Sequence, residues 1–139
     1  MTKFTQRHSF VFAICVVLLA STACKHKNDP QPDLLLQKTW IVKKVEVDGM
    51  DKTSAFSNMT LKFSPGKYTA TNGGDVWADN GTWSYAKNSS TLIIRGDGVQ
   101  VTISEITEKN LQLNFTWLET TFKGGRIMGI KGNNTFMFE

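Results

Sequence analysis

Period-two alternation of apolar and polar side chains is the feature that most constrains how this chain can fold. Between residues 59 and 117, large apolar residues repeatedly take every second position, and Thr, Ser, Gln or Lys stands between them. The longest examples are Met59–Ser64, Val99–Ser104 and Leu111–Trp117. Because successive side chains of a β-strand point to opposite faces, this pattern predicts half-buried antiparallel strands with one face in water.

Turn signals separate these segments at short intervals. The clearest turns are expected around Gly66, Gly73 and Asp97, where Gly, Pro, Asn and Asp gather. The apolar segment Trp40–Val47 changes phase at Lys43-Lys44, which predicts a β-bulge. We expect eight strands, near residues 40–47, 59–64, 67–71, 82–85, 92–94, 99–104, 111–117 and 134–138. Leu92 and Ile94 are the apolar pair of the fifth strand.

Eight sequential antiparallel strands with one wet face can remove their exposed edges by closing into a barrel. The predicted fold is therefore an all-β, eight-stranded, antiparallel up-and-down barrel over residues 34–139. A two-sheet sandwich is the competing architecture, and the short sequential hairpins favour the barrel. Asp33 before Leu34-Leu35-Leu36 is a candidate N-cap for one short helical turn, which could lie against one end of the domain.

The N-terminal segment has the pattern of a secretory signal. Lys3 and Arg7 precede the almost wholly apolar stretch from Phe10 to Ala20, and small residues follow up to Cys24. That stretch is too short to cross a bilayer as a helix. A cysteine directly after the small residues resembles a bacterial lipoprotein signal, which implies acylation of Cys24 as the first residue of the mature protein. Ordinary secretion with cleavage nearby is the alternative.

This resemblance sets the expected domain organisation and location. Residues 1–23 form the signal peptide, and residues 24–33, with Pro30 and Pro32, form a lipid-anchored flexible linker before the barrel. The expected membrane partner is reached through the lipid on Cys24. The expected location is the cell envelope, on either face of the outer membrane.

Charge and side-chain inventory exclude several classes of function. The whole chain has a formal net charge of +4, but the leader holds two of these charges, so 14 basic and 12 acidic residues remain. No basic run longer than Lys43-Lys44 remains, which argues against nucleic-acid binding. The domain after residue 33 contains neither Cys nor His, which rules out Cys–His or Ser–His–Asp catalysis and a His/Cys zinc site. We expect no enzyme activity and no cofactor. Carboxylate pairs such as Asp75/Asp79 or Glu105/Glu108 would be the remaining catalytic candidates.

The order of several short motifs resembles the bacterial lipocalin-like domain found in lipoproteins of the Bacteroidetes group. The resemblance covers residues 34–139 and implies a barrel that binds a small ligand. A Gly-x-Trp motif lies in mid-chain at Gly81-Thr82-Trp83 rather than in the first strand. The motifs that carry the resemblance are Lys38-Thr39-Trp40, Asp48-Gly49, Leu61–Tyr68, Gly81–Tyr85, Leu111–Phe115 and Gly132–Phe136.

Aromatic residues at the inward positions are the first candidate site. They could line a pocket for an apolar ligand or simply fill a small dry core. The residues are Trp40, Tyr68, Trp83, Tyr85, Phe115 and Trp117.

Two loops supply further candidates. In the loop after Gly73, we expect Trp77 to be exposed, and Asp75, Asp79 and Asn80 carry oxygen ligands of the kind that calcium prefers. A hairpin with solvated acids is the alternative. In the loop after Trp117, Arg126 could bind a ligand carboxylate as a fork or form an ion pair with Glu119.

Two functions remain in contention. One is a tethered barrel that holds a small apolar molecule. The other is a structural or interaction lipoprotein whose filled core leaves only its surface to bind a protein or an envelope component. An interior cavity of roughly 300 Å³ or more would favour the carrier, and a filled core would favour a surface role.

Overall fold

The computed structural model describes residues 32–118, 122–123, 126–127 and 130–139. The predicted signal peptide, Cys24 and most of the predicted linker lie outside the described residues. The elements in chain order are α1 (Pro32–Leu36), β1 (Thr39–Val47), β2 (Met50–Asp51), the 3-10 helix η1 (Thr53–Phe56), β3 (Thr60–Ser64), β4 (Lys67–Thr71), β5 (Asn80–Tyr85), β6 (Leu92–Arg95), β7 (Gln100–Ile106), β8 (Leu111–Trp117), β9 (Phe122–Lys123), β10 (Arg126–Ile127) and β11 (Gly132–Phe138).

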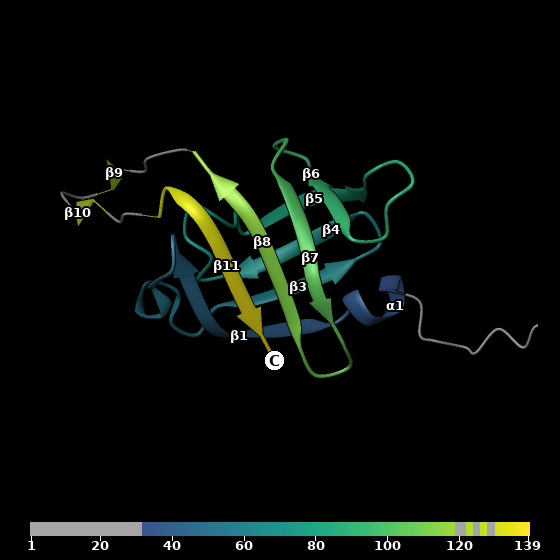
Figure 1. The fold of residues 1–139 in the computed structure, drawn as a ribbon, viewed down its shortest axis with the longest axis horizontal. Helices are drawn as coiled ribbons and strands as arrows, with labels where there is room; N and C mark the ends of the chain where they lie inside the picture. Colours follow the sequence, from purple (N-terminus) through teal and green to yellow (C-terminus); the bar gives the residue numbers. More distant parts are fainter. Residues whose placement is uncertain (1–31, 119–121, 124–125, 128–129) are drawn as a thin grey trace, which may run out of the picture.

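The strands form a closed antiparallel barrel, as the sequence predicts. The sheet order is β11-β8-β7-β6-β5-β4-β3-β1, and β1 pairs with β11 to close the ring of eight strands. Figure 1 shows β1 and β11 side by side. Barrel strands that follow one another in the sequence are neighbours in the sheet, so the topology is up-and-down. The short strand β2 adds to β1, and β9 pairs with β10 in a separate ribbon.

The predicted bulge in the first strand is confirmed. The register of β1 against β11 shifts between Val42 and Lys44, which leaves Lys43 as the extra residue. A second shift falls between Ile103 and Glu105, where β7 pairs with β8. Each bulge bends its strand and increases the local twist, which helps a small barrel to close.

Alternation places the predicted residues on the inner face in most strands. The exception is β6, where Ile93 and Arg95 point inward and are buried. Leu92 is only partly buried, and Ile94 is 37% exposed. The expectation that Leu92 and Ile94 supply the apolar face is therefore wrong. A strand of four residues with three consecutive apolar ones does not fix its own register, and pairing with β5 and β7 does so instead.

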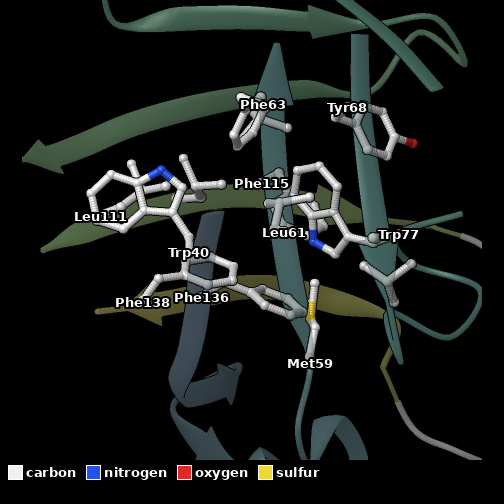
Figure 2. Packing of buried hydrophobic residues seen from close by; sticks show 14 of the residues in the cluster. Trp40, Met59, Leu61, Phe63, Tyr68, Trp77, Leu111, Phe115, Phe136 and Phe138 are labelled. Atoms are coloured by element: carbon white, nitrogen blue, oxygen red, sulfur yellow. The ribbon is translucent and has the colours of Figure 1, made fainter. Parts of the chain in front are cut away.

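Trp77 lies at the centre of the barrel, although the sequence predicts an exposed side chain. It is 0% exposed and makes edge-on contacts with surrounding rings. Its ring centroid lies 5.4 Å from Tyr68, 5.6 Å from Phe115, and 6.4 Å from both Phe63 and Phe136. Figure 2 shows the indole among Phe63, Tyr68 and Leu61. The loop between β4 and β5 thus contributes the largest side chain at the centre of the core.

Glycine allows this loop to turn inward. A Cβ atom at Gly73 would lie 2.4 Å from the carbonyl oxygen of Trp77 and 2.6 Å from its Cβ atom. The Trp77 N–H donates to the Gly73 carbonyl at 3.1 Å. Gly74 has a φ of +58°, which a residue without a Cβ atom adopts readily. The loop closes on itself at these positions and directs Val76 and Trp77 into the barrel, where both are fully buried.

The helix α1 packs against one end of the barrel. Its last residue, Leu36, is fully buried, and its carbonyl accepts a hydrogen bond from Nε1 of buried Trp40 at 3.1 Å. Lys38 donates to the carbonyl of Glu108 in the β7–β8 turn and lies 3.9 Å above the Trp40 ring. The helix begins at Pro32, so Asp33 lies within it rather than capping it. Proline suits a first helical position because the N–H that it lacks would have no partner in the helix.

We predict that Gly81→Ala destabilises the barrel by about 1–3 kcal/mol, the range for overpacking a tight core. Gly81 pairs with buried Tyr68 across β4 and β5, and a Cβ atom would lie 2.5 Å from the Tyr68 ring. Urea unfolding measures the change. Ser84→Ala, on the outer face of the same strand, is the control, and Tyr68→Leu should relieve part of the loss. An effect of Gly81→Ala no larger than that of Ser84→Ala would contradict this packing.

We predict that Trp77→Ala lowers the free energy of unfolding by about 3–5 kcal/mol, as expected for deleting a large buried ring. Trp77→Phe should lose less, because a smaller ring still fills part of the space. Thermal and urea melts followed by far-ultraviolet circular dichroism provide the measurement. Ile94→Ala, at a half-exposed outer position, serves as the control and should change stability by about 1 kcal/mol or less. Equal losses for Trp77→Ala and Ile94→Ala would mean that the indole does not support the core.

Candidate functional site

The end of the barrel away from α1 carries a cleft. It has a volume of about 410 Å³ and lies between the β6–β7 turn and the end of β8. We call it the rim cleft, and the described residues that line it are Asp97, Gly98, Val99, Gln100, Thr116, Trp117 and Leu118. Trp117 is buried and Leu118 is 71% exposed, so an apolar wall runs from the core to the surface. The volume is within the usual range for small-molecule sites.

A buried cation, Arg95, lies beside two of the residues that line this cleft, Asp97 and Trp117. Arg95, the last residue of β6, is 2% exposed and points into the barrel. Its Nη1 donates to the carbonyl of Val76 at 2.7 Å, and its Nη2 donates to the carboxylate of Asp97. A buried charge is tolerated only when it is paired and hydrogen-bonded. Asp97 and the inward loop together supply that compensation.

Aromatic rings surround the guanidinium group. Its central carbon lies 4.5 Å from the ring centroid of Trp77 and 5.7 Å from those of Tyr68 and Trp117. The negative faces of such rings attract a cation, and the attraction strengthens where water is absent. Burial raises the pKa of the Tyr68 phenol above its usual value, while the charge of Arg95 acts in the opposite direction. The phenol therefore stays neutral beside Arg95 at physiological pH.

Three buried N–H donors in this region have no hydrogen-bond partner among the described residues. They are Nε of Arg95, Nε1 of Trp77 and Nε1 of Trp117. Most buried donors in proteins are paired, and an unpaired donor reduces stability. One of these donors belongs to the guanidinium group and the other two to indole rings beside it, so this region is suited to a molecule that offers acceptor oxygens.

Asp97 separates the rim cleft from a second one. That cleft, of about 310 Å³, also borders Tyr68, Gly81 and Gly96. The Asp97 side chain is 44% exposed, and its Oδ1 accepts the N–H of Val99 at 3.2 Å. Asp97 is therefore the solvent-facing partner of an otherwise buried cation.

The structure brings four of the predicted site residues together near Arg95, namely Trp77, Tyr68, Trp117 and Phe115. Tyr68 and Trp117 lie beside the guanidinium group, and Phe115 packs on Trp77. Of these four residues, Trp117 alone lines the rim cleft.

The other predicted residues lie elsewhere. Trp40 is fixed at the α1 end, and Nε1 of Trp83 donates to the carbonyls of Ser64 and Lys67 at 3.0 Å each, which fastens the β3–β4 turn. Tyr85 packs on Trp83 at 5.3 Å, and burial raises the pKa of its phenol well above the usual range. Trp40 and Trp83 thus have evident structural roles. The side chains of Arg126 and Glu119 lie outside the described residues.

Arg95 and Asp97 are the residues that sequence reasoning missed. An arginine before a Gly-Asp-Gly turn is typical of an exposed position. The signal that could have found Arg95 is its spacing from Ile93, because residues two positions apart on a strand share a face. Only the pairing of β6 with its neighbours identifies that face as the inner one.

The two acidic candidates for metal ligation in the β4–β5 loop differ in their burial. Asp79 is exposed and Asp75 is partly buried. Among the residues that the structure describes, no group of three or more acidic, histidine or cysteine side chains could hold a metal ion. Within the same residues, no helix has both the length and the apolar character needed to cross a membrane.

Comparison with known proteins gives one match. The profile of a lipocalin-like domain family matches residues 36–113, just over half of the chain, and this range contains Trp77, Arg95 and Asp97. Searches of curated proteins and of solved structures returned no match. The closed eight-stranded barrel agrees with the family assignment. By its sequence and its fold, this chain belongs to the lipocalin-like domain family.

Proposed function

We propose that this protein is a lipid-anchored, non-enzymatic module of the cell envelope that binds a small, partly apolar molecule at the rim of its barrel. The observation that carries the proposal is the rim cleft, which is walled by Trp117 beside Arg95; both residues carry a buried N–H donor that has no hydrogen-bond partner among the described residues. Membership of the lipocalin-like family supports a ligand-binding role.

The packing of the barrel favours the rim over the interior as the binding site. Trp77 and its neighbouring rings occupy the centre, and the clefts described above lie at the surface. A ligand at the rim can bury its apolar part on Val99, Trp117 and Leu118 without displacing the core. Gln100 and Thr116 lie on the same wall and offer hydrogen bonds.

The proposed anchor rests on the N-terminal sequence. The apolar stretch, the small residues and Cys24 support export and acylation, and the Pro-containing linker would hold the barrel away from the lipid surface. An acyl chain on Cys24 would bind the protein to a membrane without a spanning helix. In this proposal the barrel binds the ligand, and the lipid anchor fixes the location of the protein.

The filled centre also favours the second candidate, an interaction lipoprotein that uses its outer surface. Leu118 is 71% exposed beside the rim cleft and would suit contact with a protein. Binding of small molecules at the rim separates the two candidates, because the interaction role does not require it.

We predict that the neutral apolar probe N-phenyl-1-naphthylamine binds at the rim, with enhanced probe fluorescence and quenched tryptophan emission. Leu118→Asp should weaken binding about tenfold, since a buried leucine contributes roughly 1.5–3 kcal/mol. Leu34→Asp is the matched control, because Leu34 is 68% exposed but lies on α1 at the opposite end. Absence of probe binding, or equal loss in both variants, would contradict binding at the rim.

We predict that Cys24→Ala moves the protein from the membrane fraction to the soluble envelope fraction of its host. Cys15→Ala is the control, because Cys15 lies within the predicted leader and should not affect anchoring. Fractionation followed by intact-mass measurement of the purified protein reports both location and acylation. A Cys24→Ala variant that remains with the membrane would show that the anchor lies elsewhere.

A further inference from the structure

We propose that the ligand of the rim cleft carries an anionic group that binds Arg95, and that Asp97 occupies this position until the ligand replaces it. The inference rests on the proposed function, since it specifies the chemistry of the molecule bound at the rim. The ligand class is an amphiphilic anion, with a carboxylate or similar acid joined to an apolar ring or chain.

The guanidinium edge that faces Asp97 is only half used. Nε and Nη2 lie on the same edge of the planar guanidinium group, where they form a fork that matches the two oxygens of a carboxylate. Asp97 places Oδ2 on Nη2, and its Oδ1 accepts the Val99 N–H instead. Nε has no acceptor among the described residues. A free carboxylate could bind Nε and Nη2 together, which Asp97 does not do.

Asp97 is placed where it could leave. Its side chain is 44% exposed, whereas that of Arg95 is 1% exposed, so the aspartate can return to water and the arginine cannot. It lies in a tight turn between Gly96 and Gly98, and Gly98 has a φ of +86°. Asp97 also borders both clefts, so its departure would open the space between them to a ligand.

Charge balance selects an anion over a neutral acceptor. Once Asp97 turns away, the cation of Arg95 keeps the Val76 carbonyl and the rings of Trp77, Tyr68 and Trp117, but it loses the one carboxylate that pairs with it among the described residues. A buried charge without a counter-ion is strongly unfavourable, and a neutral ligand would not replace the lost one. An anionic ligand restores the pair. Its apolar part can then rest on Trp117, whose ring centroid lies 5.7 Å from the guanidinium carbon.

Two probes that differ only in charge test this inference. 8-Anilino-1-naphthalenesulfonate carries a sulfonate that N-phenyl-1-naphthylamine lacks, and both are otherwise the same naphthylamine. Fluorescence titration of the full chain carrying Cys24→Ala avoids lipid, which would itself take up the probes. We expect the anionic probe to bind about tenfold more tightly than the neutral one, from charge-assisted hydrogen bonds to Arg95. Equal affinities would overturn the inference.

Variants then assign the preference to Arg95. Asp97→Asn removes the internal competitor and should strengthen binding of the anionic probe severalfold, with little change for the neutral probe. Glu105→Gln makes the same change of net charge on the far part of β7 and should leave both affinities unchanged. Arg95→Lys keeps the charge but not the fork, so the preference for the anion should fall. If these variants fail to fold, the comparison of the two probes on the parent chain still decides.

The outcomes separate this inference from the proposed function. Failure of both probes to bind overturns the proposed function and the inference with it. Equal binding of both probes, sensitive to Leu118→Asp, supports the rim site and overturns the role of Arg95. Equal strengthening by Asp97→Asn and Glu105→Gln would indicate a general charge effect and also overturns the inference.

Discussion

The packing of one indole ring in the centre of a closed barrel is the interaction on which the rest of this structure depends. An eight-stranded barrel encloses a space that its own side chains can just fill or that can hold one small ligand. Here Trp77 enters that space from the β4–β5 loop and contacts rings from β3, β4, β8 and β11. The occupied centre favours the rim as the binding site that we propose.

The same loop also holds the buried cation. Val76 supplies a carbonyl to Arg95, and the next residue supplies the ring on which the guanidinium group lies. A charge in a dry core is stable only with such partners. The loop, Arg95 and Asp97 therefore form one unit, and a change in any of them should alter the shape or the charge of the rim cleft.

The features that depend on local signals in the sequence are confirmed by the structure. Alternation located the barrel strands, and the phase change at Lys43-Lys44 located a bulge, because both follow from the period of a β-strand. The expectation that Trp77 is exposed is wrong, because Trp77 stands in a loop of Gly, Asp and Asn that is typical of a solvated turn. The expected apolar face of β6 is also wrong, because Leu92, Ile93 and Ile94 fit either register.

The pattern along the chain was sufficient to predict strands and turns and to favour closure into a barrel, since these depend on side-chain period and short connections. It also specified a domain without thiol or imidazole chemistry. The position of Trp77 and the burial of Arg95 were settled in three dimensions. A loop can turn into a core only after distant strands have enclosed it, and the inward face of a short strand is set by the strands that pair with it.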